Sequence, residues 1–186
     1  MKVTFAFILA LLINSLTIAN ASSVPSSGVL EEDVVEEQAS SAKYHMGWPE
    51  AQALASSIAD HCKETGIAFK GILMIMRGGG VPGTLLTQKL NIKNSRTICL
   101  ESYSDEHKKG NIRIISQPTD IIDEGEGWLV VDDIADSGAT LEYSRKLYPK
   151  AHYVTMVSKP IGKAHTDFSA KDFPQDTWIV FPWEDK

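Results

Sequence analysis

The stretch that decides the fold is Val130-Val131-Asp132-Asp133-Ile134-Ala135-Asp136-Ser137-Gly138-Ala139-Thr140. It follows Trp128-Leu129, so an apolar run typical of a buried strand ends in two adjacent carboxylates. A short turn then leads into a helix expected over residues 139–148, which Pro149 stops. An apolar strand, a turn and a helix in this order are typical of an α/β fold with a parallel sheet.

The turn after this strand has the properties of a phosphate site. In parallel sheets, ligands bind at the carboxyl ends of the strands, and a helix N-terminus offers unpaired N–H groups to an anion. Gly138 lets the backbone come close to the anion, and Ser137 and Thr140 add hydroxyl donors. The alternative is a plain helix-capping turn with surface acids, which the apolar strand and the doubled acid disfavour.

Asp132 and Asp133 restrict the kind of phosphate that fits. Carboxylates repel a phosphate unless a sugar or a cation lies between them. These two can accept hydrogen bonds from ribose hydroxyls, or hold Mg²⁺ directly or through water. The stretch therefore predicts a sugar phosphate bound together with magnesium.

The rest of the chain fits the same fold class. Small and apolar residues recur at helical spacing between Trp48 and Cys62, and Leu85, Leu86 and Leu90 indicate a second helix. Short apolar strands alternate with the helices, which favours a sheet covered on both faces. The expected strands span residues 71–76, 97–103, 112–116, 128–132, 152–158 and 178–181.

Composition excludes some classes of partner. The formal net charge is −6, and residues 1–43 contribute −3 through two Lys against five Asp or Glu. Neither part is basic, so we expect no nucleic-acid partner. A phosphate site in this chain has to be local.

The first 21 residues have the pattern of an export signal. Lys2 precedes a mostly apolar run from Val3 to Ile18, and Ala19-Asn20-Ala21 fits a cleavage site. An uncleaved membrane anchor, and hence membrane association, is the alternative, and translation from Met46 would give a cytosolic protein. We expect residues 22–43 to be a disordered acidic linker and residues 44–186 to be the folded domain.

Cysteine and histidine usage gives no sign of a metal centre. Cys62 falls on an expected helix and Cys99 on an expected buried strand, so packed free thiols are favoured over a disulfide. The five histidines are scattered, and we expect them to be surface or packing residues.

Several separated stretches, taken in order, resemble bacterial xanthine-guanine phosphoribosyltransferases of the type I phosphoribosyltransferase family. Besides the quoted stretch, they are residues 76–83, 99–103, 125–127, 148–152, 159–160 and 174–179. The resemblance implies a mostly parallel sheet flanked by helices, with a small hood. It implies an enzyme that uses Mg²⁺, transfers the 5-phosphoribosyl group of phosphoribosyl diphosphate to a 6-oxopurine, and forms homo-oligomers.

The resemblance also assigns roles to residues. Arg77, Gly78 and Gly79 match the diphosphate loop, which often has a non-proline cis peptide in this family. The ribose 5-phosphate would be held by residues of the quoted stretch, and Asp133 would bind the metal. The full expected set for this phosphate is Asp132, Asp133, Asp136, Ser137, Gly138, Ala139 and Thr140.

Four residues match the purine site of the family. Asp136 is the expected catalytic residue, beside N7 of the base, where general-base help is typically worth ~10²–10⁴-fold. Lys159 would donate to the 6-oxo group. Trp178 would stack on the ring, and the Ile179 carbonyl would face the 2-position.

The chain departs from the family pattern in three places. Residues 104–124, which match a mobile loop, are longer than expected, and their Lys108, Lys109 and Arg113 could reach the diphosphate. Ala139 replaces a common glycine, and the chain ends soon after Trp183. A non-catalytic sensor of phosphoribosyl diphosphate, or a repurposed exported binding protein, is the alternative to an enzyme.

Overall fold

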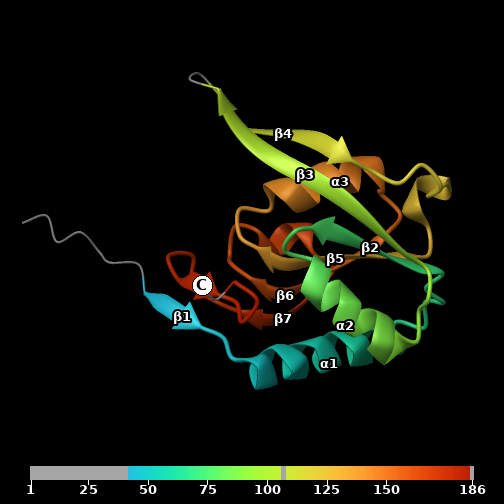
Figure 1. Cartoon of the computed structure of the whole chain (residues 1–186), viewed down its shortest axis with the longest axis horizontal. Helices are drawn as coiled ribbons and strands as arrows, with labels where there is room; N and C mark the ends of the chain where they lie inside the picture. Colours follow the sequence, from blue (N-terminus) through green and yellow to red (C-terminus); the bar gives the residue numbers. More distant parts are fainter. Residues whose placement is uncertain (1–41, 106–107, 185–186) are drawn as a thin grey trace, which may run out of the picture. The chain divides into compact units, whose positions relative to one another are not determined.

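A central sheet of six strands organises residues 42–105 and 108–184, the part of the chain that this computed structural model describes. The strand order is β4-β3-β2-β5-β6-β7, and every neighbouring pair is parallel except β3 and β4 (Figure 1). The mostly parallel α/β sheet expected from the sequence is therefore confirmed. The elements are β1 (Lys43–His45), α1 (Trp48–Glu64), β2 (Gly71–Met76), α2 (Gly80–Leu90), β3 (Ser95–Asp105), β4 (Lys108–Ser116), β5 (Trp128–Ala135), α3 (Ala139–Leu147), β6 (His152–Ser158), β7 (Phe168–Asp172) and β8 (Trp178–Val180), with short 3₁₀ turns at Asp123–Gly125 and Lys163–His165.

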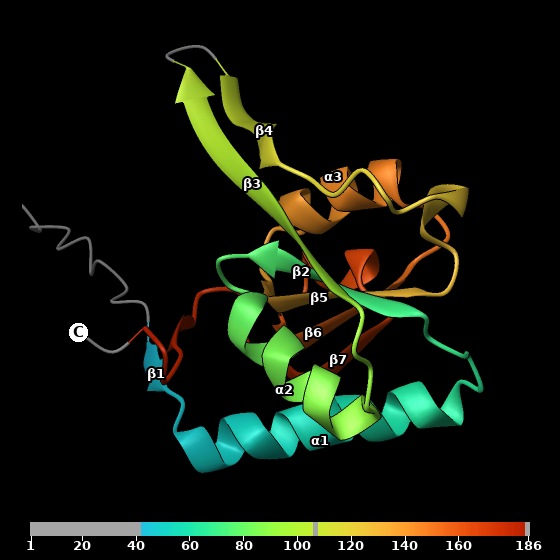
Figure 2. The same ribbon diagram turned by 45° about the vertical axis from the view of Figure 1, so that its right-hand side comes forward.

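The central strands β2 and β5 are apolar because both of their faces are covered. Side chains of β2 alternate: Ile72 and Met74 join a core with α1 and α2, while Leu73 and Ile75 join a second core with α3. Figures 1 and 2 show α1 and α2 on one side of the sheet and α3 on the other. Completely burying one large aliphatic side chain is worth about 1.5–3 kcal/mol, so these two cores hold the strand ends firmly in place.

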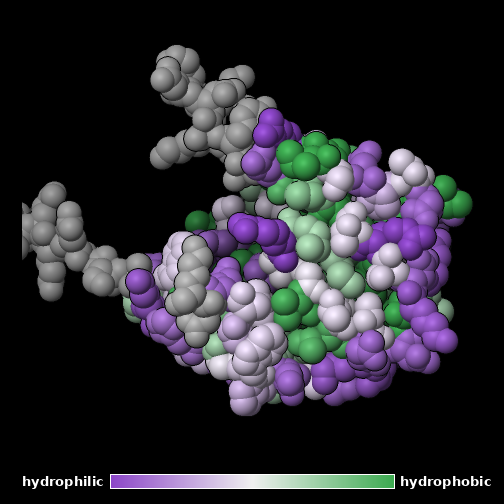
Figure 3. Space-filling model, viewed as in Figure 1, coloured by the Kyte–Doolittle hydropathy of each residue, from purple (hydrophilic) through white to green (hydrophobic). Residues whose placement is uncertain are grey.

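The segment that matches the family's mobile loop includes the end of β3 and all of β4, and these two strands form an antiparallel ribbon. Strand β2 pairs with β3 only as far as Cys99, and beyond this point β3 continues antiparallel to β4 (Figure 2). In β4 the described side chains from Ile112 to Ile115 alternate between half-buried and exposed, as in a strand with one covered face. Figure 3 shows hydrophobic residues gathered where this ribbon leaves the sheet. The expected strand over residues 112–116 is confirmed as part of β4, which begins earlier, at Lys108.

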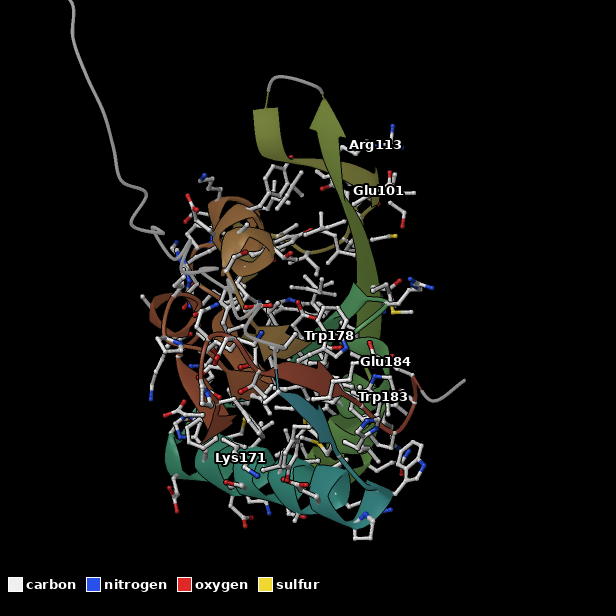
Figure 4. The ribbon with its side chains drawn as sticks, turned by 90° about the vertical axis from the view of Figure 1, so that its left-hand side faces the viewer. Glu101, Arg113, Lys171, Trp178, Trp183 and Glu184 are labelled. Carbon is white, nitrogen blue, oxygen red and sulfur yellow. The ribbon has the colours of Figure 1, made fainter. Side chains whose placement is uncertain are left out.

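Two strands were missed in the sequence. Strand β7 extends the sheet beside β6, and β1 pairs with β8 in a separate two-stranded parallel sheet. Tyr44 on β1 donates to Glu50 Oε2 at 2.8 Å, and Lys171 on β7 donates to Glu50 Oε1 at 2.7 Å. Figure 4 shows Lys171 beside α1. The hydrogen bond between Lys171 and Glu50 raises the pKa of Lys171 and lowers the pKa of Glu50. Glu50 thus links α1 both to β1 of the small sheet and to β7 of the central sheet.

The two cysteines are free thiols with different surroundings. Cys62 is buried in α1, and burial raises the pKa of its thiol to about 12. Cys99 is only partly buried, so the expectation that both thiols are packed holds for Cys62 alone.

Residues 42–105 and 108–184 contain no helix that is long and apolar enough to cross a membrane. The expected leader, residues 1–21, and nearly all of the expected linker lie outside the described residues.

Candidate active site

A cavity of about 1140 Å³ opens at the carboxyl ends of β2 and β5, beside the ribbon. The order of the strands reverses between β2 and β5, and ligands in open parallel sheets bind at such a reversal. The cavity therefore brings together residues from distant parts of the sequence. The predicted site residues that line it are Arg77, Gly78, Asp132, Asp133 and Thr140. The other lining residues are Ile75, Met76, Cys99, Leu100, Glu101, Arg113, Ile115, Trp183 and Glu184.

The glycines after β2 are required by close contacts with β5. A Cβ on Gly78 would lie 2.4 Å from Asp133 Oδ1, and a Cβ on Gly79 would lie 2.2 Å from the carbonyl oxygen of Val131. The peptide bond between Met76 and Arg77 is cis, as expected for this loop. The expected diphosphate loop and the expected metal ligand are therefore in direct contact.

Asp132 and Asp133 form a buried acidic pair. The backbone N–H of Asp133 donates to Asp132 Oδ1 at 3.0 Å, and the two side chains are 7% and 8% exposed. Burial, together with the charge of Asp133, raises the pKa of Asp132 well above its usual range. Burial also raises the pKa of Asp133 to about 6, and the charge of Glu184 adds to this shift.

The acidic pair fits a magnesium site that the substrate completes. Among the described residues, no three Asp, Glu, His or Cys side chains come close enough to hold a metal on their own. Mg²⁺ in phosphate-transfer sites is usually held by one or two carboxylates and by substrate phosphates, and it keeps several waters. A cation beside the pair would also relieve the cost of two buried negative charges.

The expected phosphate loop lies between β5 and α3. Gly138 precedes α3 with φ +80°, Ala139 is its first helical residue, and no side chain caps this end. The N–H of Ala139 makes only a 3.4 Å contact with Ser137 Oγ. A Cβ on Gly138 would lie 2.2 Å from the His165 ring, so this ring lies directly against the loop. The first turn of α3 can therefore offer backbone donors to an anion.

Asp136 and Lys159, predicted from separate stretches, are in contact. Lys159 Nζ donates to Asp136 Oδ2 at 3.1 Å, and the lysine is only 5% exposed although it follows the end of a strand. Gln175 Nε2 donates to the other oxygen, Asp136 Oδ1, at 2.9 Å. We refer to Asp136, Lys159 and Gln175 as the Asp136 cluster. Its members do not line the cavity described above.

Trp178 and Ile179 lie on β8, outside the lining of that cavity. Trp178 is 61% exposed, so its ring is accessible and is not a core residue. Ile179 is buried with only 6% exposure, and its backbone pairs with Tyr44 in β1. Figure 4 shows Trp178 close to the level of Trp183 and Glu184, below the ribbon.

Some residues of the site were missed or only partly foreseen. Glu101 faces Arg113 across the ribbon, and Arg113 Nε donates to Glu101 Oε2 at 2.7 Å (Figure 4). Trp183 and Glu184 close another side of the cavity. The side chains of Lys108 and Lys109 lie outside the described residues. The alternation in β4 was a usable signal for Arg113, whereas no local pattern marked Glu184.

Comparison with known proteins finds one family and several similar structures. The sequence model of the phosphoribosyl transferase domain matches residues 46–184. A purine phosphoribosyltransferase from Pyrococcus horikoshii is 23% identical, with a TM-score of 0.66 over 77% of this chain and 95% of that one. The xanthine-guanine-hypoxanthine phosphoribosyltransferase of Helicobacter pylori is 24% identical, with a TM-score of 0.66 over 76% and 94%. Hypoxanthine phosphoribosyltransferase from Trypanosoma cruzi, in complex with the product IMP, is 23% identical, with a TM-score of 0.51 over 68% and 75%. At these identities the structures establish a shared fold.

Proposed function

The chain belongs to the phosphoribosyl transferase domain family, and we propose that it transfers the 5-phosphoribosyl group from phosphoribosyl diphosphate to a 6-oxopurine. Guanine, xanthine and hypoxanthine are the proposed bases, which makes the reaction one of purine salvage. The names of the Helicobacter and Trypanosoma structures support this substrate class. The bond between C1 of the ribose and the diphosphate breaks, and a purine ring nitrogen bonds to C1. The diphosphate takes the bonding electrons, and the base loses a proton.

The contact between Asp136 and Lys159 is the observation that carries the proposal. It places a carboxylate acceptor next to an ammonium donor. A 6-oxopurine that carries its proton on N7 presents a donor next to the O6 acceptor, and so matches this pair. Adenine presents an amino donor at the 6-position, which would face the lysine without an acceptor. A mismatched buried donor costs about 1–3 kcal/mol, enough to discriminate between the bases.

Asp136 is proposed to take the proton that leaves the ring as the new bond forms. Lys159 would hold the 6-oxo group, and the exposed ring of Trp178 would stack on the purine. The Ile179 carbonyl would face the 2-position, which favours guanine with its 2-amino donor. Hypoxanthine has no 2-substituent and should bind more weakly.

The cavity is proposed to hold the other substrate. Arg77, Gly78 and Gly79 would bind the diphosphate, and the first turn of α3 would bind the 5-phosphate. Asp133, with Asp132 beside it, would hold Mg²⁺ or the ribose hydroxyls. When bound, Mg²⁺ would neutralise the charge that develops on the diphosphate.

The test is a turnover panel with the purified chain, Mg²⁺ and phosphoribosyl diphosphate. We expect guanine, xanthine or hypoxanthine to give nucleotide, and adenine to give none. Asp136→Asn should lower turnover by ~10²–10⁴-fold, because the amide cannot accept the proton, while binding of phosphoribosyl diphosphate persists. If no 6-oxopurine reacts while the sugar phosphate binds, the chain is a sensor and not this enzyme.

Two further proposals concern the whole chain. The pattern of residues 1–21 supports export with cleavage after Ala21, and mass measurement of the native N-terminus distinguishes cleavage, an uncleaved anchor and a start at Met46. Resemblance to the family supports a homo-oligomer, which light scattering would test.

A further inference from the structure

The side chain of Gln175 joins three segments that carry the proposed purine contacts. Its Nε2 donates to Asp136 Oδ1 at 2.9 Å, and its Oε1 accepts from the backbone N–H of Ile161 at 3.0 Å. Asp136 follows β5, and Ile161 lies two residues after Lys159. Gln175 itself lies three residues before Trp178. One amide therefore links the acid, the lysine loop and the strand with the stacking ring.

The chemistry of its two partners fixes the orientation of this amide. A carboxylate only accepts hydrogen bonds, so the NH₂ group of Gln175 has to face Asp136. A backbone N–H only donates, so the carbonyl oxygen has to face Ile161. Exchanging the two ends would lose both hydrogen bonds, and Gln175 is thus held in a single arrangement.

Asp136 depends on side-chain partners for its own orientation. Its side chain is 52% exposed, and the terminal torsion of an aspartate is intrinsically broad. Lys159 Nζ contacts Oδ2, and Gln175 contacts Oδ1. In the proposed reaction Lys159 also donates a hydrogen bond to the 6-oxo group of the purine. Gln175 is then the donor that remains dedicated to the acid throughout the reaction.

We infer that Gln175 is a positioning residue that orients Asp136 toward the base and links this orientation to the loop that carries Lys159. The inference rests on the proposed function. Loss of the amide should lower kcat and raise the KM for the purine. The KM for phosphoribosyl diphosphate should stay unchanged, because Gln175 does not line the cavity proposed to hold that substrate.

The experiment compares full-length variants, with Mg²⁺, phosphoribosyl diphosphate and the best base of the panel. Gln175→Met keeps the approximate shape and removes both hydrogen bonds. We expect kcat to fall by up to about 10²-fold, the scale of a misaimed catalytic group. Asp176→Asn, a change in the same loop, is the matched control and should have the kinetics of the parent.

Gln175→Glu separates positioning from a general loss of structure. The introduced carboxyl faces Asp136 Oδ1, while Lys159 contacts the other oxygen of Asp136, Oδ2. Two ionised carboxylates repel, so at pH 8 this variant should resemble Gln175→Met. Once protonated, the introduced carboxyl can donate to Asp136 as the amide did, so the ratio of variant to parent kcat should rise as the pH falls. Simple loss of packing gives no such rise.

Each of three outcomes would overturn the inference about Gln175. A Gln175→Met enzyme with parental kcat and purine KM overturns the inference. Equal loss of purine and phosphoribosyl-diphosphate affinity, together with a lower melting temperature, overturns it in favour of a structural role. A parent chain that turns over no base refutes the proposed function first, and the inference with it.

Discussion

The cavity and the Asp136 cluster differ in what holds their functional groups in place. In the cavity, the acidic pair and the glycines after β2 lie on buried strand ends, in contact with backbone atoms. In the Asp136 cluster, side chains from three loops hold one another by hydrogen bonds, and the acid is half exposed. Changes in the cavity should therefore alter the fold and its electrostatics, whereas changes at the cluster should alter how the base is handled.

The largest effect should come from Gly79→Ala. The new Cβ would lie 2.2 Å from the carbonyl oxygen of Val131 and 2.7 Å from that of Ile75, and these backbone atoms belong to central strands. We expect the free energy of unfolding to fall by about 1–3 kcal/mol, with loss of phosphoribosyl-diphosphate binding. Denaturant unfolding and ligand titration measure the two effects. Gly47→Ala is the control, because Gly47 has a φ of −87° and its added Cβ would make only an ordinary 3.6 Å contact with Pro49 Cδ. Equal effects at both positions would contradict the crowding argument.

Asp133→Asn should separate stability from function. The pKa of Asp133 is raised from 3.8 to about 6, so between these pH values the folded chain binds more protons than the unfolded chain. The stability contributed by this group is therefore present below pH 4 and is lost as the pH rises to 6. At pH 7 the asparagine should raise the free energy of unfolding by roughly 1–3 kcal/mol while it abolishes Mg²⁺-dependent turnover.

Unfolding curves at pH 4 and pH 7, recorded without Mg²⁺, measure this difference. The gain should be small at pH 4, where the parental carboxyl is already protonated. An Asp133→Asn chain that keeps the parental pH dependence would show that burial of this acid costs the fold nothing.

The smallest of the three effects should come from Trp178→Leu. Base stacking is worth about 1–3 kcal/mol, so the KM for the purine should rise by roughly 10-fold or more. Trp178 is 61% exposed, and the free energy of unfolding should change by no more than about 0.5 kcal/mol. Trp178→Phe keeps a ring and should keep most of the affinity. If the leucine variant unfolds more easily and the KM is unaltered, Trp178 serves the fold and not the substrate.

Much of the fold could be predicted because the central strands are buried on both faces. The apolar runs of β2 and β5 stand out in the sequence and end at the residues of the cavity. Strand β7 was missed because Phe168–Asp172 is only partly buried and mixes polar with apolar residues. Strand β1 has only three residues, and its partner β8 comes near the other end of the sequence, at Trp178–Val180.

Prediction of the site was limited where its contacts join residues that are far apart in the sequence. Asp132, Asp133 and Gly138 lie in one continuous stretch, so their chemistry could be inferred together. Gln175 contacts an acid 39 positions earlier, and Glu184 acts on Asp133 through space. Contacts of this kind depend on how the strands pair, which no local pattern in the sequence encodes.

The contact between Gly138 and the His165 ring limits how the protein can be engineered. Replacing glycine with alanine often strengthens a protein, because the alanine reduces the conformational freedom of the unfolded chain. Here the φ of +80° disfavours alanine, and the imidazole already occupies the space of its methyl group. Positions 138 and 165 are therefore coupled: a side chain at position 138 requires a smaller residue at position 165, and the positive φ still disfavours it.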